Sequence, residues 1–381
     1  MIHALVVAND GESAELISKL ARLSEQVVIE RLFCPEPRHP ELSHVLNTLP
    51  LDVVLLDLSH PGEASLLLDQ IREKNPALPV AGFCFSGDEP APLTPFLLPM
   101  PLSPRGFIDT IRGAIHASRK APYPNVFAIL PAKAGAGAST IAVNAAAQVA
   151  ASCGKKVAVA DADLRSGIMA ESLGLRAQEP IEETLPLADA AHSLIWPRHV
   201  AQKSGVDFLL TSRGKAQIQW HDYHHLIKFL SRRYDSVVID LPEALDDANL
   251  ESVRAASCVY IATTPEFLSL TLARQRIVEM ETANVDRSRI RILVNRWHAR
   301  DLKPADVATL LGCPVEAVFP NDYPAVHAAI EARSLVDART RLGAAYRSFA
   351  VQLAGGEPAR VDAAKGSLLG ALRWSMGSSA A

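Results

Sequence analysis

Residues 131–140 bring small residues, one lysine and two hydroxyl side chains together directly after an apolar run. They read Pro-Ala-Lys-Ala-Gly-Ala-Gly-Ala-Ser-Thr, and a helix-forming sequence follows from Ile141. A turn of small residues between a strand and a helix exposes backbone N–H groups and the positive end of the helix dipole, both of which attract anions. The segment therefore predicts a loop that binds the phosphates of a nucleoside triphosphate.

The loop lacks the lysine that phosphate loops usually carry. The usual pattern ends Gly-Lys-Ser/Thr, in which the lysine contacts the outer phosphates and the hydroxyl binds Mg²⁺. Here the corresponding residues are Gly137, Ala138 and Ser139, so the hydroxyl is kept and a methyl group replaces the ammonium. A lysine stands earlier in the loop, at Lys133. Because phosphoryl transfer depends on neutralising charge, we expect slow hydrolysis or none.

Two later apolar runs end in acidic residues. Residues 155–164 form a strand-like run that carries Asp161 and Asp163, and alternate positions of a strand point to the same side. Residues 234–242 form a second run with Asp240 near its end, the form of a Walker B motif. An acid in that place holds magnesium through water. Ser139 and Asp240 therefore predict a Mg²⁺ site beside the phosphate loop.

The order and spacing of these motifs resemble the ParA/MinD family of P-loop ATPases, whose deviant Walker A motif reads Lys-Gly-Gly-x-Gly-Lys-Thr-Thr. The resemblance implies that Lys133 crosses a dimer interface to the partner's nucleotide. It also implies that Asp163 lies near the attacking water, that Asp161 lies beside the magnesium shell, and that ATP or ADP is bound with Mg²⁺. The following residues would then surround the nucleotide phosphates: Lys133, Ala134, Gly135, Ala136, Gly137, Ala138, Ser139 and Thr140.

Two further segments extend the resemblance over roughly residues 124–350. The run from Ile290 ends in Asn295 and Arg296, where the family meets the adenine, and Asn295 is the better candidate. The later segment containing Pro320, Asn321 and Asp322 resembles the family's closing stretch, whose backbone brackets the base. The wording Pro-Asn-Asp-Tyr points to the TadZ/CpaE branch, which positions the Tad (Flp) type IV pilus machinery in the cell.

Length and composition agree with a large α/β protein. In 381 residues, apolar strands alternate with amphipathic, helix-length segments through nearly the whole chain. This pattern predicts two doubly wound parallel-sheet domains, a receiver-like flavodoxin-type fold followed by a ParA/MinD-type P-loop NTPase fold. The net charge of −4, without a dense Lys/Arg cluster, argues against a nucleic-acid partner. The five cysteines are scattered without close pairing, so we assign them no metal.

No apolar stretch of the sequence is long enough to span a bilayer, and the sequence begins at once with a strand-like segment. We therefore expect a cytoplasmic protein that resides at a cell pole or at the surface of the inner membrane. The Gly/Ala/Ser-rich tail from residue 355 is expected to be mobile. Within it, residues 367–376 predict a short apolar-faced helix that makes weak contact with a membrane or, more favourably, with a partner.

Residues 1–118 resemble a response-regulator receiver domain with eroded chemistry. Asp57 ends the third predicted strand, where receivers carry the phosphorylated aspartate, and Asp10 stands where an acid pair would bind magnesium. Ser86 lies late for the required hydroxyl, and Met100-Pro101 replaces the Lys-Pro that would balance phosphoryl charge. We therefore predict a pseudo-receiver used for dimerisation or docking. The alternative interpretation of Asp57 is an ordinary acid at the end of a strand.

The sequence thus predicts a receiver-like domain at 1–118, a linker at 119–125, a ParA/MinD-like ATPase domain at 126–354 and a tail at 355–381. Its predicted function is that of an ATP-binding, homodimeric positioning protein for the Tad pilus machinery, with pilus or secretion proteins as partners. Two alternatives remain open. One is an active ParA-type DNA-partitioning ATPase, and the other is a signalling switch controlled by phosphorylation of Asp57.

Overall fold

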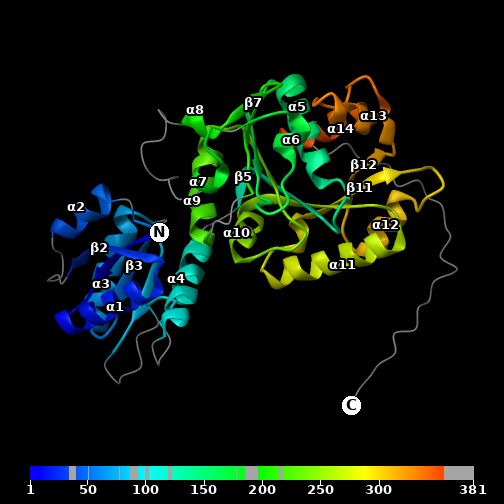
Figure 1. The fold of residues 1–381 in the computed structure, drawn as a ribbon. Coiled ribbons are helices and arrows are strands. Elements are labelled where there is room, and N and C mark those ends of the chain that lie inside the picture. The colour runs from blue at the N-terminus through cyan, green and yellow to red at the C-terminus, as the bar shows by residue number, and fades with distance from the viewer. Residues whose placement is uncertain are drawn as a thin grey trace, which may run out of the picture.

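The computed structural model describes residues 1–33, 40–49, 51–76, 78–85, 93–98, 103–118, 122–176, 178–184, 196–213 and 218–355. Within these ranges the chain forms two α/β domains that lie side by side (Figure 1). The predicted fold class, two domains built on predominantly parallel sheets, is confirmed. No helix in the described part of the chain is long and apolar enough to cross a membrane.

The first domain contains a parallel sheet of four described strands in the order β2-β1-β3-β4, which is the order of flavodoxin-type folds. Its elements are β1 (Ile2–Val7), α1 (Gly11–Ser24), β2 (Val27–Phe33), α2 (Pro40–Thr48), β3 (Val53–Asp57), α3 (Pro61–Lys74), β4 (Val80–Phe83) and α4 (Pro104–Ser118). The apolar side chains of α1 and α4 pack on one face of this sheet, and those of α2 and α3 pack on the other. A single bridge from Gly82 to Leu97 marks where a further edge strand would pair.

The second domain is built on a sheet of eight described strands in the order β12-β11-β10-β5-β9-β6-β8-β7. Neighbouring strands are parallel except β7 and β8. The first half of its elements comprises β5 (Tyr123–Pro131), α5 (Ala138–Cys153), β6 (Val157–Asp161), α6 (Met169–Leu173), α7 (Ile181–Thr184), α8 (Trp196–His199), β7 (Ala201–Lys203), β8 (Val206–Leu209) and α9 (Trp220–Arg233). The second half comprises β9 (Ser236–Asp240), α10 (Asp247–Ala255), β10 (Ala256–Thr263), α11 (Phe267–Thr282), η2 (Arg287–Arg289), β11 (Ile290–Trp297), α12 (Pro304–Leu311), β12 (Val315–Pro320), α13 (Tyr323–Glu331) and α14 (Arg341–Leu353).

Helices cover both faces of the larger sheet, as its apolar strands require. Helices α5 and α14 bury their apolar sides against one face, together with alternate residues such as Phe127 and Ile129 of β5. Helices α9, α10, α11 and α12 cover the other face, on which Val126, Ala128 and Leu130 of the same strand lie. Alternate side chains of β5 therefore contribute to the apolar cores on both faces of the sheet. The strand order places β5 in the interior of the sheet.

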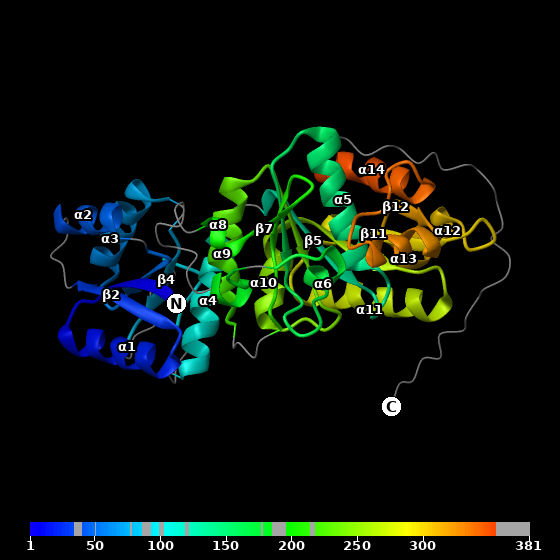
Figure 2. The ribbon, with the colours of Figure 1, turned by 45° about the horizontal axis from the view of Figure 1, so that its top comes forward.

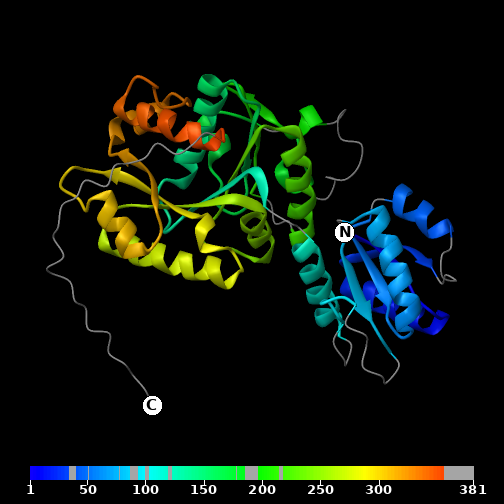
Figure 3. The same cartoon turned by 180° about the vertical axis from the view of Figure 1, so that it is seen from behind.

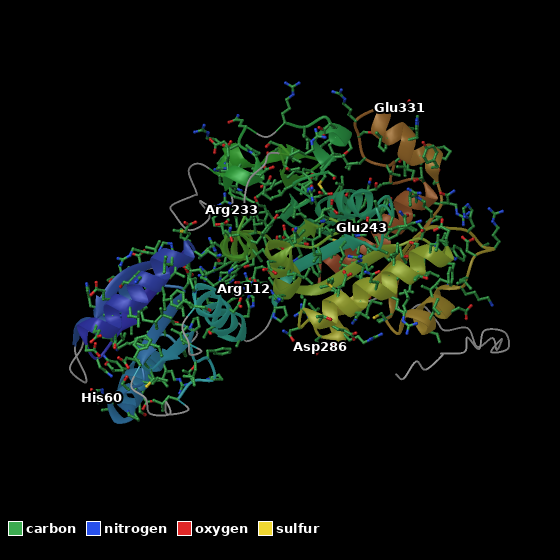
Figure 4. The ribbon with its side chains drawn as sticks, turned by 60° about the horizontal axis from the view of Figure 1, so that its bottom comes forward. His60, Arg112, Arg233, Glu243, Asp286 and Glu331 are labelled. Carbon is green, nitrogen blue, oxygen red and sulfur yellow. The ribbon has the colours of Figure 1, made fainter. Side chains whose placement is uncertain are left out.

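The domains meet where α4 lies beside α9 and α10 (Figures 2 and 3). Trp220, the first residue of α9, is 1% exposed and belongs to the apolar core of the first domain. The Arg112 guanidinium lies 5.2 Å from the centre of the Trp220 ring and 3.3 Å from the Asp247 carboxylate (Figure 4). The fully buried Glu251 carboxylate of α10 lies 2.6 Å from His116 Nε2 of α4. These contacts, among them one aromatic side chain, one Arg–Asp ion pair and one His–Glu contact, fix the first domain on these helices.

Strand β5 begins at Tyr123, inside the stretch predicted as a linker, because Pro124 falls near the start of the strand, where a missing N–H is tolerated. Several predictions concern residues outside those that the structure describes: Cys34, Ser86, Met100, Pro101 and the tail helix at 367–376.

Candidate nucleotide site

A cavity of about 1080 Å³ opens at the carboxyl ends of the central strands of the second domain. Its volume lies at the upper end of the range of small-molecule sites, and its place is where open α/β sheets bind ligands. The predicted site residues that line it are Ala134, Gly135, Gly137, Ala138, Ser139, Thr140, Asp163, Asn295, Arg296, Pro320, Asn321 and Asp322. The structure therefore gathers most of the predicted site around one cavity.

The phosphate loop connects β5 to α5 as predicted. Gly137 is the N-cap of α5 and makes no side-chain cap hydrogen bond. The first N–H groups of a helix have no partner within the helix, and here Ala138, Ser139 and Thr140 supply them at the cavity wall. The loop also has Gly135 at φ +77° and Gly137 at φ +94°, a backbone region that favours glycine. The loop therefore offers an anion both free donors and the positive end of a helix of 16 residues.

Asn295 and Arg296 hold the loop from the end of β11. Asn295 Nδ2 donates to the Ala136 carbonyl at 2.8 Å, and the Arg296 guanidinium donates to the Gly135 carbonyl at 2.9 Å. A Cβ atom at Gly137 would collide with Asn295 Nδ2. Both side chains were predicted to meet the adenine. In this structure their hydrogen bonds are to the phosphate loop, and the adenine contact stays a prediction.

Two buried carboxylates lie beneath the loop. Strands β6 and β9 place Asp161 opposite Asp240, and the two residues are 1% and 2% exposed. Within the described part of the chain, neither oxygen of Asp161 and not Oδ1 of Asp240 has a hydrogen-bond partner of normal geometry. Buried carboxylates without partners are costly, so a cation that both could bind would stabilise the native state. The pair therefore fits the predicted Mg²⁺ site.

The electrostatics of this pair favour binding of a cation. Burial raises the pKa of Asp161 to about 7, although backbone N–H groups of Met169 and Asp163 lie near enough to oppose the rise. Burial and the charge of Asp161 raise the pKa of Asp240 well above its usual range, while the Ser139 hydroxyl opposes the rise. No cluster of three or more His, Cys, Asp or Glu residues that could hold a metal occurs among the described residues. A cation at Asp161, Asp240 and Ser139 would therefore need further ligands, such as phosphate oxygens and water.

Asp163 and Lys133 lie at the edges of the site. Asp163 lines the cavity, and its Oδ1 accepts hydrogen bonds from the N–H groups of Arg165 (3.3 Å) and Ser166 (2.9 Å). Lys133 is not one of the residues that line the cavity. Its side chain is 37% exposed, and its Nζ lies 4.0 Å from the Glu266 carboxylate. The Lys133 ammonium thus lies beside Glu266 and outside the set of residues that line the cavity.

The far wall of the cavity comes from the end of β12 and the start of α13. The Asn321 N–H donates to the Trp297 carbonyl at 3.1 Å, and Asp322 caps α13 by accepting from the Ala325 N–H at 3.2 Å. These contacts fix the predicted base-binding backbone. Beside it Tyr323 lines the cavity and is 65% exposed.

One wall of the cavity was not predicted from the sequence. Residues 241–246, between β9 and α10, line the cavity together with Tyr223 and Asn249. Within this loop the Glu243 carboxylate accepts a hydrogen bond from the Ala134 N–H at 2.7 Å. The position of these residues in the sequence could have indicated this wall, because a loop that follows a Walker B strand lies at the same sheet edge as the phosphate loop. Polar residues on a loop do not by themselves show which way they point.

The receiver-like residues of the first domain form a satisfied polar cluster. The buried Asp57 carboxylate accepts hydrogen bonds from the Asn9 N–H (3.1 Å), the Ser59 N–H (2.9 Å) and the Ser59 hydroxyl (2.6 Å). The Asp10 carboxylate instead caps α1, and hydrogen bonds from Ser13 lower its pKa. Asp10 is therefore committed to its own helix, and neutral donors already stabilise Asp57.

Known proteins resemble the second domain. A family model described as ParA, NUBPL iron-transfer P-loop NTPase, matches residues 123–293. The septum site-determining protein MinD of Thermotoga maritima is 25% identical over 191 residues, which are 49% of this chain and 69% of that protein. The MinD protein of Synechocystis sp. is 25% identical over 262 residues, which are 65% of this chain and 97% of that protein.

Solved structures share the fold. A ParA family ATPase from Chlorobium tepidum TLS has a TM-score of 0.56 and 21% identity, and the match covers 60% of this chain and 99% of that one. MinD complexed with Mg-ADP from Pyrococcus horikoshii OT3 has a TM-score of 0.52 and 20% identity, with 60% and 95% covered. The second domain therefore has the fold of ParA/MinD-type P-loop NTPases.

Proposed function

We propose that this chain, whose second domain is a P-loop NTPase of the ParA/MinD family, binds ATP with Mg²⁺ as a homodimer and positions a larger assembly in the cell. The observation that carries the proposal is a pair of buried carboxylates beside the N-terminus of α5: within the described part of the chain, both oxygens of Asp161 and Oδ1 of Asp240 lack a hydrogen-bond partner. Such a site is electrostatically incomplete without a cation and an anion together. A Mg²⁺–nucleotide complex supplies both charges.

Each part of the site has a role in this proposal. The first N–H groups of α5 would hold the phosphates, and Ser139, Asp161 and Asp240 would hold Mg²⁺, which supplies charge neutralisation. Residues Pro320 to Asp322 would bracket the base. Asp163 would orient the attacking water if hydrolysis occurs. Since Ala138 supplies no cation, we expect binding without rapid turnover.

The rim of the cavity supports a homodimer. Three apolar side chains that line it are nevertheless well exposed: Ile168 at 55%, Tyr323 at 65% and Ile330 at 50%. Lys133, in the same loop as Ala134 and Gly135, is partly exposed, with its Nζ 4.0 Å from the Glu266 carboxylate. A second copy of the chain would cover this rim, enclose the nucleotide and receive the lysine. The nucleotide would then act as a clamp between two subunits.

The cellular role that we propose is assembly of the Tad (Flp) type IV pilus machinery at one place in the cell. Support comes from the Pro-Asn-Asp-Tyr segment at residues 320–323 and from the combination of a receiver-like domain with the NTPase domain. The four-stranded first domain, with its satisfied Asp57, would serve as a docking module. Pilus or secretion proteins would be its partners at a pole or at the inner membrane.

The cellular proposal is tested by imaging a fluorescent fusion in the source cell and by staining pili in a deletion strain. We expect one focus per cell and loss of pili, restored by the wild-type gene but not by the Asp240→Asn variant. A diffuse fusion with normal pili would refute this role. ATP-dependent, salt-sensitive retention on DNA would favour the partitioning ATPase instead. Labelling by acetyl phosphate that disappears in Asp57→Asn would favour the phosphorylation switch.

A further inference from the structure

The Glu243 carboxylate already accepts a hydrogen bond from one N–H group of the phosphate loop. Its Oε2 accepts the Ala134 N–H at 2.7 Å, and both residues line the nucleotide cavity. A carboxylate bound to a backbone N–H imitates the contact that a phosphate oxygen makes in an anion site. The chain therefore places a negative charge of its own where a phosphate loop offers donors to a nucleotide.

The surrounding structure holds Glu243 in this position. The Arg276 guanidinium of α11 donates to the Glu243 carbonyl at 3.0 Å and pairs with Glu279 at 2.6 Å. Asp246, at the other end of the same loop, caps α10 by accepting from the Asn249 N–H at 2.8 Å. The loop is thus fixed at both ends. The side chain, which is only partly buried, remains free to leave the Ala134 N–H without unfolding either helix.

Few positive charges near the loop offset the charge of Glu243. A phosphate loop with its usual lysine would outweigh one nearby carboxylate, but the corresponding residue here is Ala138. The loop's own Lys133 lies 4.0 Å from another carboxylate, that of Glu266. Phosphate oxygens that approach Ala134 therefore meet a carboxylate that competes for the same donor and repels them.

We propose that Glu243 competes with the nucleotide phosphates for the Ala134 N–H. Its carboxylate keeps this donor occupied until a nucleotide or the partner subunit displaces it. This inference rests on the proposed nucleotide binding and adds the residue that limits its affinity. Removal of the carboxylate frees the Ala134 N–H and removes the repulsion. Nucleotide binding therefore becomes tighter in the variant than in the natural chain.

The test measures Mg²⁺–ATP binding by calorimetry and hydrogen exchange of residues 131–137 by mass spectrometry in the full-length protein. Glu243→Gln keeps the shape and removes the charge, whereas Glu243→Ala also removes the acceptor. Glu331→Gln is the control, since it removes the same charge from the exposed end of α13, away from Glu243 (Figure 4). We expect the Kd for ATP to fall about tenfold in Glu243→Ala, equivalent to about 1.4 kcal/mol, and by less in Glu243→Gln.

Hydrogen exchange provides a readout that needs no nucleotide. Without ATP, exchange of residues 131–137 should be faster in Glu243→Ala than in the wild type, and unchanged in Glu331→Gln. An ATP affinity in both Glu243 variants that equals or falls below that of the wild type would overturn the competitor role, whatever the exchange rates. If neither the wild type nor any variant binds ATP, the proposed function itself fails, and with it the competitor role. The two failures are thus distinguished by whether the wild type binds.

Discussion

Asp161 and Asp240 face each other across β6 and β9, and the residue that would supply a cation above them is Ala138. At the scale of single residues the site therefore has two buried carboxyl groups whose pKa values are raised and no lysine at position 138. The motif residues could be predicted from sequence, because strand ends and loops with fixed spacing determine where they lie. The hydrogen bonds of Asn295 and Glu243 to the loop could not be predicted, because they depend on side-chain directions that spacing does not encode.

A lysine at position 138 should strengthen the binding of nucleotide phosphates. Ala138 lines the cavity, so a lysine there begins at the cavity wall and extends toward bound phosphates. We expect Ala138→Lys to bind Mg²⁺–ATP at least tenfold more tightly, since a charged hydrogen bond contributes about 1.5–3 kcal/mol. We also expect measurable phosphate release. Calorimetry and a phosphate-release assay check both, with Ala151→Lys, at the exposed C-terminal end of α5 and away from the loop, as control. Equal affinities of Ala138→Lys and the wild type would contradict the assignment of this position.

The raised pKa of Asp161 predicts a pH dependence of stability. The native carboxyl keeps its proton up to a pKa of about 7, whereas the ordinary value is 3.8. The stability that the protonated form contributes is therefore complete below about pH 4 and is lost as the pH rises through 7. Asp161→Asn stays neutral at every pH, so at pH 8 we expect it to be more stable than the wild type by about 1–3 kcal/mol.

Urea unfolding of both proteins at pH 5 and pH 8, without Mg²⁺, measures this difference. The wild type should lose stability between the two pH values, and the variant should lose less. Addition of Mg²⁺ with ATP should stabilise the wild type at pH 8 and leave the variant little changed. Parallel losses of stability in the two proteins would show that Asp161 does not titrate in this range.

At the scale of elements, the turn between β5 and α5 determines the geometry of the site. Its position was predictable, since a small-residue turn between an apolar run and a helix pattern has few alternative structures. The start of β5 at Tyr123 was not, because Pro124 is typical of a break in sequence but is tolerated at the first residues of a strand. The order of strands in the larger sheet likewise follows from long-range pairing, which local patterns do not specify.

The two glycines of the turn should differ in their tolerance of a methyl group. Both have positive φ, but a Cβ at Gly137 collides with Asn295 whereas a Cβ at Gly135 meets open space. We expect Gly135→Ala to cost about 1 kcal/mol from backbone strain alone. Gly137→Ala should cost more and should abolish nucleotide binding, because Asn295 must leave the Ala136 carbonyl. Thermal unfolding and ATP binding of the two variants provide the comparison, and equal effects would contradict the proposed contact.

At the scale of the whole molecule, the first domain is joined to the two helices that also line the cavity of the second domain. Tyr223 of α9 and Asn249 of α10 lie at the cavity, whereas Trp220 and Glu251 of the same helices contact the first domain. The sequence predicted both domains but not their contact, because apolar periodicity does not distinguish a side chain buried in its own domain from one buried in another.

Trp220 should be the main apolar contact between the domains. It is 1% exposed, and we expect Trp220→Ala to destabilise the protein by about 3–5 kcal/mol. Phe267→Ala is the control, since Phe267 is 70% exposed and its loss should change stability by less than about 0.5 kcal/mol. Urea unfolding measures both changes. Limited proteolysis should then cut Trp220→Ala faster than the wild type. A Trp220→Ala protein as stable as the control would contradict this interface.

The most direct test of the account is calorimetry of ATP and ADP with Mg²⁺, combined with light-scattering mass of the same sample with and without nucleotide. We predict micromolar ATP binding, conversion of a monomer to a dimer, and phosphate release near background. Lys133→Ala should keep the binding and lose the dimer, because Lys133 does not line the cavity of its own subunit. Absence of nucleotide binding together with an unchanged mass would contradict the proposed nucleotide-dependent dimer and leave the second domain as a scaffold.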